Sequence, residues 1–322
     1  MKISRYIISQ KKVKGKVQRE FGYRSQKGGK RITSKEILRY IFTLHIPPAW
    51  KEVTIFYSPN PNYYKVRATG FDEAGRKQYR YAPWWIKRAR NTKLHGMKKF
   101  AKRFPYIEKD IKEKLRSRGL AKEKIIALMV ALMVSCSIRV GCDKYTALYN
   151  SYGVSTLEKR HVRVTGDTVH VKFIGKKGVL NTCETRDALI AKNIKALMQN
   201  KGKNERVFER GGFTCRNTDI NEWLKGIDKD FSSKMFRIYK ANIELISRLR
   251  RLDGERLTKT ERKKYTVEVY KKIARIIHNT PPVAKKDYCD SEFADLFIEH
   301  PRAWKHRFSQ KSTRASFIDW LR

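Results

Sequence analysis

The apolar run at residues 125–138 constrains the fold of this 322-residue chain more than any other feature. A helix that crosses a bilayer needs about 20 apolar residues, so this run is too short to span a membrane. It predicts a helix buried in the centre of a globular core. Apolar residues make up 40% of the chain, which is enough for real cores, and the length fits two domains better than one.

The charge balance predicts an anionic partner. The chain holds 74 Lys and Arg against 31 Asp and Glu, a net charge of +43. Such an excess destabilises a compact fold by self-repulsion unless a polyanion neutralises it. No long amphipathic basic helix lies at a terminus, so a nucleic acid is favoured over a membrane surface. The positive charge is spread along the whole chain, and both predicted domains are expected to contact phosphates.

The remaining composition narrows the function further. The five cysteines show no CxxC spacing and no even pairing, and no signal peptide precedes the chain, which together favour a reducing, intracellular compartment. The histidines lack the spacing of a metal site, so no metal is expected. A GxxxxGK[ST] motif is missing, which argues against an ATP-driven motor. No cofactor is predicted.

The N-terminal part predicts a small β-rich domain, at residues 1–90. Residues 1–30 are basic and weakly patterned, and we interpret them as a poorly ordered arm. A short helix is expected at 34–44, and the two prolines of IPPAW (46–50) predict a turn. Alternating runs at 53–57, 64–70 and 77–81 predict an antiparallel sheet whose last two strands join through a turn at 72–75. Residues 84–90 are expected to form a basic connection.

The rest of the chain, residues 91–322, predicts a larger and mainly helical domain. Helical patterns cover about 92–118, 121–138, 142–151, 185–200, 217–227, 232–250, 259–278 and a C-terminal piece. A three-stranded β-island interrupts them at 161–165, 168–174 and 179–183. The fold class is therefore α+β.

Four residues place cations and a phenol where turns or burial could hold them. Arg139 follows the apolar helix, Lys176 lies at the tip of a tight turn, Arg237 lies in an amphipathic helix, and Tyr288 follows two lysines. Taken alone, each residue has a common structural explanation. In the same order, these are an arginine at a helix C-terminus, a solvated lysine, an arginine in a surface ion pair and a structural tyrosine. Their order along the chain is what suggests chemistry.

This order resembles the type IB DNA topoisomerases, and specifically the short branch found in poxviruses, large DNA viruses and bacteria. Each motif is weak alone, but together they follow the family order. The motifs that carry the resemblance are LHIPPAW (44–50), ATGFDEAGRKQYRYAPWW (68–85), SIRVGCDKY (137–145), SYGVSTLEKRHVRV (151–164), FIGKKG (173–178), DFSSKMFRIYKAN (230–242) and IIHNTPPVAKKDY (276–288).

The resemblance implies the tyrosine recombinase and topoisomerase IB catalytic fold, and a mechanism without ATP or metal. Tyr288 would attack a phosphodiester and hold the 3′ phosphate, while Arg139 and Arg237 donate to the non-bridging oxygens and Lys176 protonates the leaving 5′ oxygen. Asn279 occupies a position where poxviral and cellular nuclear members have histidine; an asparagine can donate but does not titrate. The enzyme would relax supercoils.

Supporting roles follow from the same resemblance. Lys234 matches a basic residue near the active site, and Asn242 matches a side chain that supports the lysine. His278 precedes Asn279 and should point about 100° away from it on a helix. Tyr145 matches a tyrosine that contacts phosphates or bases. The DNA-facing hairpin contributes Arg76, Lys77, Gln78, Tyr79 and Tyr81, and strand alternation places Gln78 on the face opposite the two tyrosines.

Two alternatives stay open. A tyrosine recombinase or integrase shares the Arg–Lys–Arg–Tyr chemistry, but recombinases usually have His-x-x-Arg where this chain has Lys234-x-x-Arg237, and they have helical N-terminal domains. A non-enzymatic DNA-packaging protein would explain the charge but not the ordered motifs. We expect a monomer that clamps double-stranded DNA, without membrane association. The lysine-rich composition leans towards a large DNA virus over a bacterium, which would place the protein in the virion, the virus factory or the host nucleus.

Overall fold

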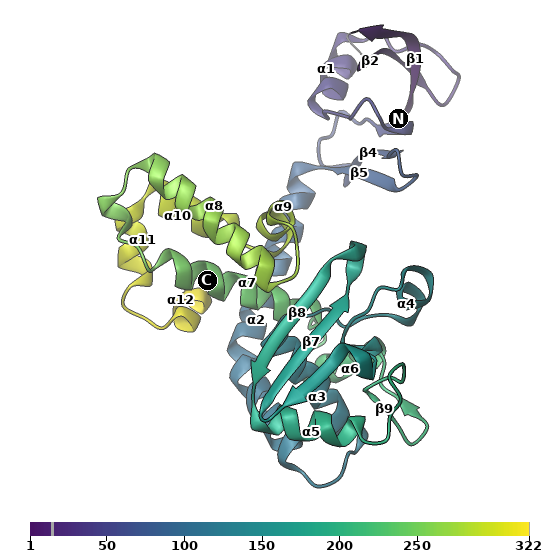
Figure 1. Ribbon diagram of the computed structural model, residues 1–322. Coiled ribbons are helices and arrows are strands. Elements are labelled where there is room, and N and C mark those ends of the chain that lie inside the picture. Colours follow the sequence, from purple (N-terminus) through teal and green to yellow (C-terminus); the bar gives the residue numbers. More distant parts are fainter. Residues whose placement is uncertain (14–15, 322) are drawn as a thin grey trace. The chain divides into compact units, whose positions relative to one another are not determined.

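The computed structural model describes residues 1–13 and 16–321, which divide into two compact units, Met1–Lys93 and Leu94–Arg322 (Figure 1). The N-terminal unit is built on an antiparallel sheet in the order β2-β1-β3-β4-β5. A small apolar core joins α1 to this sheet through Ile3, Ile41, Val53, Ile55 and Ala68. The elements of this unit are β1 (Lys2–Val13), β2 (Lys16–Ser25), α1 (Lys35–Thr43), β3 (Lys51–Phe56), β4 (Val66–Phe71) and β5 (Lys77–Tyr81).

The prediction of a poorly ordered arm at residues 1–30 is wrong for residues 1–13 and 16–30; residues 14–15 lie outside the described part of the chain. Strands β1 and β2 pair antiparallel, and β1 also pairs with β3. Ile3 is fully buried, and the Arg5 guanidinium lies 4.1 Å from the centre of the Phe21 ring. Arg5 Nη1 also donates to the Pro47 carbonyl at 3.1 Å, which ties β1 to the predicted IPPAW turn. The backbone ladder and these few anchors stabilise a segment whose composition alone favoured disorder.

Helix α2 (Pro83–Arg116) begins earlier than predicted. The basic stretch at 84–90, expected as a connection, forms its first turns. Pro83 stands at the start of the helix, where the missing N–H of proline has no intrahelical partner to lose. The boundary between the two units therefore lies within a continuous helix and not in a loop.

The buried helix predicted from the apolar run is confirmed as α3 (Lys122–Cys136), with Ile125 to Met133 buried on every side. It is in contact with α5 (Ala188–Met198), α6 (Asn217–Ile227) and α7 (Lys234–Leu249). Helices α8 (Lys259–Ile276), α10 (Ser291–Glu299) and α12 (Thr313–Trp320) pack on α7, and α11 (Pro301–Phe308) packs against α10. In the described part of the chain, no helix is long and apolar enough to cross a membrane.

The predicted β-island is also confirmed. Its sheet has the order β6-β7-β8, with β6 (Val162–Thr165), β7 (Thr168–Ile174) and β8 (Leu180–Arg186) all antiparallel, and it lies against α3 and α5 (Figure 1). The short helix α4 (Asp143–Tyr149) precedes this sheet. A second pair of very short strands, β9 (Glu209–Arg210) and β10 (Phe213–Thr214), was not predicted, because two-residue strands leave no periodic pattern.

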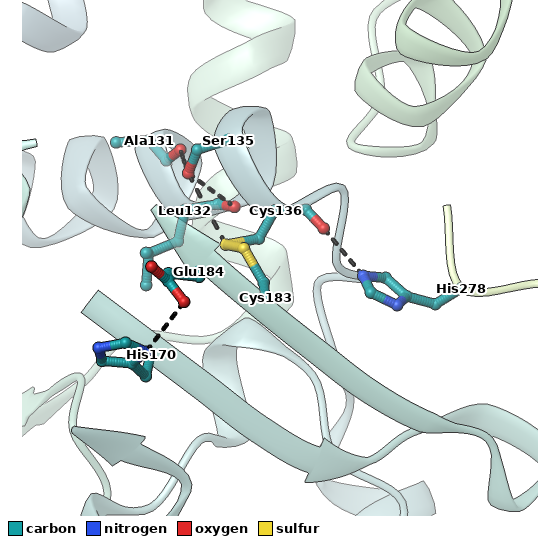
Figure 2. The surroundings of a disulfide bond; sticks show 8 residues. All are labelled: Ala131, Leu132, Ser135, Cys136, His170, Cys183, Glu184 and His278. Atoms are coloured by element: carbon teal, nitrogen blue, oxygen red, sulfur yellow. Dashed lines mark hydrogen bonds and ion pairs between the residues drawn. A yellow bond between two sulfur atoms is a disulfide. The ribbon is translucent and has the colours of Figure 1, made fainter. Parts of the chain in front are cut away.

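The structure corrects the interpretation of the cysteines. Cys136, the last residue of α3, forms a disulfide with Cys183 of β8 (Figure 2). Their Cα atoms lie 5.5 Å apart, within the range that a disulfide requires. The two residues are 47 positions apart in the sequence, so no local spacing pattern could have indicated the pair. Cys142, Cys215 and Cys289 remain thiols.

Candidate active site

The C-terminal end of α3 is the point around which the candidate site is built. Ser137 ends the helix in the left-handed conformation, with φ of 53°. The last carbonyls of a helix have no intrahelical partners. Here the Cys136 carbonyl accepts a hydrogen bond from His278 Nε2 at 3.0 Å, and the Ser137 carbonyl accepts one from Arg237 Nε at 3.0 Å. The helix end thus fixes side chains from two other elements.

Arg139 lies on the extended segment that follows α3. The backbone N–H groups of Val154 and Ser155 donate to the carbonyls of Arg139 and Val140 at 2.8 and 2.7 Å, which anchors the segment. The guanidinium donates to the His278 carbonyl at 3.3 Å. Gly153 makes this close backbone approach possible, because a Cβ at Gly153 would lie 2.4 Å from the nitrogen of Gly141.

Arg237, on α7, is the most buried cation of the site, with 2% of its surface exposed. Besides the bond to Ser137, its Nη1 donates to the Tyr288 hydroxyl at 2.6 Å and its Nη2 donates to the Ile277 carbonyl. Burial lowers the pKa of Arg237 to about 10, and the nearby charge of Arg139 acts in the same direction. A group with this pKa remains protonated at neutral pH, so a full positive charge lies beside the phenol.

Tyr288 is placed by an unusual backbone. Two prolines begin the short helix α9 (Pro281–Val283), and a π-helical turn, Ala284–Tyr288, carries the tyrosine. Single π turns are rare and occur often at functional sites. The guanidinium of Arg237 lies 4.6 Å from the ring centre, and Lys234 Nζ lies 5.4 Å from it.

The charges around Tyr288 favour its ionised form. Burial raises the pKa of this phenol, but the positive charges of Arg237, Arg139 and Lys234 outweigh the burial and leave the pKa below its usual value. The direction is the one that a phenolate nucleophile needs.

Asn242, on α7, contacts the backbone at the tyrosine and just after it. Its buried side-chain amide donates to the Tyr288 carbonyl at 2.9 Å, and its oxygen accepts from the Asp290 N–H at 2.8 Å. A further bond goes to the Ile238 carbonyl. None of these bonds reaches Lys176, so the expected support of the lysine is replaced by support of the tyrosine backbone.

Lys176 lies in the turn between β7 and β8 and is exposed. Lys177 and Gly178 close this turn with positive φ angles of 63° and 72°. Gly175 packs directly over the buried Asn181, whose amide donates to the Val179 carbonyl at 2.8 Å. The base of the turn is therefore rigidly packed, while the lysine side chain projects from it.

All five predicted catalytic residues line one cleft of about 650 Å³. The charged and polar side chains around it are Arg139, Lys176, Lys177, Ser233, Lys234, Arg237, Asn279, Thr280, Asp287 and Tyr288. Because cations outnumber the one carboxylate, the cleft suits a phosphate group. Among the described residues, no cluster of His, Cys, Asp and Glu is arranged to hold a metal ion.

The two neighbours His278 and Asn279 take different directions. His278 is buried in the left-handed conformation, with φ of 48°, and its ring turns to the Cys136 carbonyl. Because a carbonyl only accepts, His278 Nε2 carries the proton; burial lowers the pKa of the imidazole, which favours this neutral form. Asn279 lines the cleft, and its buried Nδ2 has no hydrogen-bond partner among the described residues. That amide can donate to a ligand.

The residues predicted to contact DNA in the N-terminal unit lie on the β4–β5 hairpin. Tyr79 and Tyr81 are 45% and 43% exposed and stack on one face of β5, with ring centres 5.8 Å apart. Lys77 Nζ lies 5.9 Å from the Tyr79 ring centre. Gln78 lies on the opposite, partly buried face of the strand, as alternation predicts. These tyrosines are therefore surface residues and not half-buried members of the sheet.

The turn of this hairpin is held by Asp72. Its carboxylate accepts from Arg76 Nε and from Gln78 Nε2, both at 2.9 Å. Arg76 and Gln78 therefore already have intramolecular partners in the absence of DNA.

Tyr145 does not line the cleft. It lies on α4, is 57% exposed and stacks with Tyr149, whose ring centre is 6.1 Å away. Sequence reasoning missed the pairing of Cys136 with Cys183, although Cys136 directly precedes the motif at 137–145.

Comparison with known proteins identifies the family. Residues 85–307 match the family model described as eukaryotic DNA topoisomerase I, catalytic core, and residues 20–72 match that of the bacterial DNA topoisomerase IB, N-terminal domain. DNA topoisomerase 1B of Acanthamoeba polyphaga mimivirus is 30% identical over 282 residues, which cover 84% of this chain and 82% of that protein. The chain belongs to the type IB DNA topoisomerase family.

A second relative covers less. DNA topoisomerase 1 of Mycosarcoma maydis is 25% identical over 158 residues, 42% of this chain and 15% of that protein. The resemblance read from the motifs is thus confirmed: the chain is a type I DNA topoisomerase of the IB class that acts on DNA. The viral relative and the bacterial N-terminal model both fit the short branch of the type IB topoisomerases.

Gly153→Ala should impair this topoisomerase through the position of Arg139. The added methyl group would lie 2.4 Å from the Gly141 nitrogen and 2.7 Å from the Arg139 carbonyl, so the segment carrying Arg139 has to shift. A shift of about 1 Å can reduce a rate on the order of 10²-fold. The measurement is the relaxation rate of a supercoiled plasmid. Gly226→Ala is the control, because nothing lies within 4 Å of a Cβ at Gly226; equal rates for the two variants would contradict the prediction.

Removing cations near Tyr288 should raise the pKa of its phenol. Positive charge stabilises the phenolate, so Arg237→Gln should raise the pKa more than Lys234→Gln, following the order of their effects. Titration of ¹³Cζ-labelled tyrosine by NMR, with Tyr288 assigned by its loss in Tyr288→Phe, measures this pKa. Lys285→Gln, beside Tyr270, should leave it unchanged. An unaltered pKa in Arg237→Gln would refute the electrostatic explanation.

Proposed function

We propose that this enzyme relaxes supercoiled double-stranded DNA through a covalent intermediate in which Tyr288 holds the 3′ phosphate of one cleaved strand. The observation that carries the proposal is the short bond from Arg237 Nη1 to the Tyr288 hydroxyl, 2.6 Å long, in a cleft lined by cations. The phenol is held next to the charges that would stabilise both its ionised form and the phosphate that it attacks.

Arg237 retains donors for that phosphate. A guanidinium has five N–H groups, and three of them are used by Ser137, Tyr288 and Ile277. One N–H on each terminal nitrogen is left, which matches two non-bridging oxygens. Arg139 would supply a second guanidinium, and the unpartnered amide of Asn279 a further donor. Removing one such donor typically lowers the rate on the order of 10²–10³-fold.

The transesterification balances without a further reactant. The Tyr288 oxygen forms a bond to phosphorus as its proton passes to water, and the bond from phosphorus to the 5′ oxygen breaks. Lys176, at the exposed tip of its turn, would give the proton that the 5′ oxygen needs and recover it on religation. Because one phosphate ester replaces another, the energy of the broken bond is conserved and ATP is unnecessary. The arginines would supply the positive charge, so we propose a metal-independent reaction.

Binding of duplex DNA would use both units. The net charge of +43 is far from neutral, and the stacked pair Tyr79 and Tyr81 with Lys77 presents an exposed, cationic aromatic surface. We propose that residues 1–90 form a DNA-clamping domain and that residues 91–322 form the catalytic domain. A single protein molecule, as a monomer, would act on each duplex. The proposed setting is intracellular and, if the protein is viral, the virion, the virus factory or the host nucleus.

Tyr288→Phe should abolish plasmid relaxation while DNA binding is retained, because only the nucleophilic oxygen is lost. Relaxation is followed on agarose gels, and binding by fluorescence anisotropy of a labelled duplex. Tyr270→Phe is a matched control, since Tyr270 is equally buried and its hydroxyl has no partner among the described residues. A covalent DNA adduct trapped by denaturant should form in wild type and in this control only. Relaxation by Tyr288→Phe would exclude the proposed mechanism.

Binding should weaken steeply with salt. Each phosphate contact contributes about −0.9 to the slope of log K against log salt. Lys77→Gln should make this slope shallower by about one contact, whereas Lys259→Gln, whose lysine pairs with Glu299 at 2.5 Å, should leave it unchanged. Anisotropy titrations at four or more KCl concentrations measure the slope, and a shallow slope in wild type would show that most of the charge does not face DNA.

A further inference from the structure

The disulfide Cys136–Cys183 connects two of the elements that carry candidate catalytic residues. Cys136 is the last residue of α3, three positions before Arg139, and its carbonyl accepts from His278. Cys183 lies on β8, the strand that follows the turn with Lys176 (Figure 2). One covalent bond therefore joins the lysine hairpin to the helix end where the bonds from His278 and Arg237 converge.

Strand β8 has few other anchors to the core. Within residues 1–13 and 16–321, it is an edge strand of its sheet and pairs with β7 alone. Of its seven residues only Asn181 is buried, and the rest are exposed or half-buried. Strand β7, in contrast, buries Val169, Val171 and Phe173. The disulfide thus attaches the edge strand β8 to the C-terminal end of α3.

The tie lies close enough to the turn to affect it. Cys183 is opposite Val171, and the ladder ends at the pair Ile174 and Leu180, next to the turn. At about 3.3 Å per residue, three residues of strand separate Cys183 from the end of the ladder by about 10 Å. A displacement of β8 relative to α3 would therefore also displace Lys176, because only a short segment of hydrogen-bonded strand separates Cys183 from the turn.

The two ends of the disulfide differ in burial. Cys183 is half-buried, whereas Cys136 is buried. A dithiol reductant would reduce the bond to two cysteine thiols and become a disulfide itself, a transfer of two electrons and two protons. In reducing compartments, disulfides are rare and those present are usually transient or redox-sensing. In the proposed intracellular setting, a redox-sensitive role for this disulfide is therefore favoured over the purely stabilising role that disulfides have in secreted proteins.

We propose that the Cys136–Cys183 disulfide is a redox-sensitive tie that holds Lys176 in register with the phosphate cleft, so that reduction slows strand cleavage without weakening DNA binding. The proposal rests on the proposed function, because it requires Lys176 to protonate the leaving 5′ oxygen. General acids contribute about 10²–10⁴-fold to a rate; partial loss of position should remove about 10-fold.

The test is single-turnover formation of the covalent DNA adduct by full-length protein, oxidised or treated with a dithiol. Two duplexes are compared, one ordinary and one with sulfur in place of the bridging 5′ oxygen at the cleavage site. A thiolate leaves without a proton, so loss of the general acid should not slow the second substrate. We expect reduction to slow adduct formation about 10-fold on the ordinary duplex and to leave the sulfur duplex unaffected. Alkylation and mass spectrometry report the state of the cysteines.

Two variants complete the experiment. Cys183→Ser should react at the reduced rate whether or not the dithiol is present. Cys142→Ser, which removes a thiol outside the disulfide, should keep the full response. The inference would be overturned by equal rates of adduct formation for oxidised and reduced protein, or by an equal loss of rate on both duplexes. It would also be overturned if reduction weakened DNA binding, or if the oxidised protein had five alkylatable thiols. Absence of any adduct, with either form and either duplex, would instead overturn the proposed function on which it rests.

Discussion

The end of α3 is the constraint on which the rest of the site depends. A helix must leave its last carbonyls without intrahelical partners, and in this chain those carbonyls accept from the side chains of the site. The Ser137 carbonyl accepts from Arg237, and the Cys136 carbonyl accepts from His278. The apolar run that makes α3 a fully buried helix therefore fixes both groups with little freedom. A shift of α3 would therefore also shift Arg237, the cation that donates to the hydroxyl of Tyr288.

The burial of Arg237 has a cost that the free protein does not fully offset. Among the described residues, Arg237 donates to two carbonyls and a phenol, all uncharged when the phenol is protonated. A buried cation without a counter-ion is destabilising, and the lowered pKa of Arg237 expresses this through burial and the neighbouring Arg139. A phosphate in the cleft, or an ionised Tyr288, would supply the missing negative charge. The uncompensated charge of Arg237 thus favours both a bound phosphate and the ionised form of Tyr288, the candidate nucleophile.

Much of the fold followed from local patterns, and the failures have identifiable causes. The buried helix, the three-stranded island and the hairpin at β4–β5 all rest on strong periodicity or turn chemistry, and each is present. The five residues predicted to be catalytic line one cleft. The order of their motifs along the chain predicted the set, and no local spacing pattern would have done so. The order of residues 1–13 and 16–30 was not predicted, because the high charge favoured disorder. The buried Ile3 and the backbone pairing of β1 with β2 and β3 order these residues. The Cys136–Cys183 pair depends on tertiary packing, about which local sequence carries no signal.

The sequence alone does not decide which of the neighbours His278 and Asn279 faces the cleft. Both side chains can donate hydrogen bonds, and a regular helix would only separate them by about 100°. The structure places His278 in the left-handed region, a conformation that a residue with a Cβ adopts at a cost of about 1 kcal/mol or more. The bond from its ring to the Cys136 carbonyl offsets this cost. As a result the histidine side chain is bound to the end of α3, whereas Asn279 lines the cleft and its Nδ2 has no hydrogen-bond partner among the described residues.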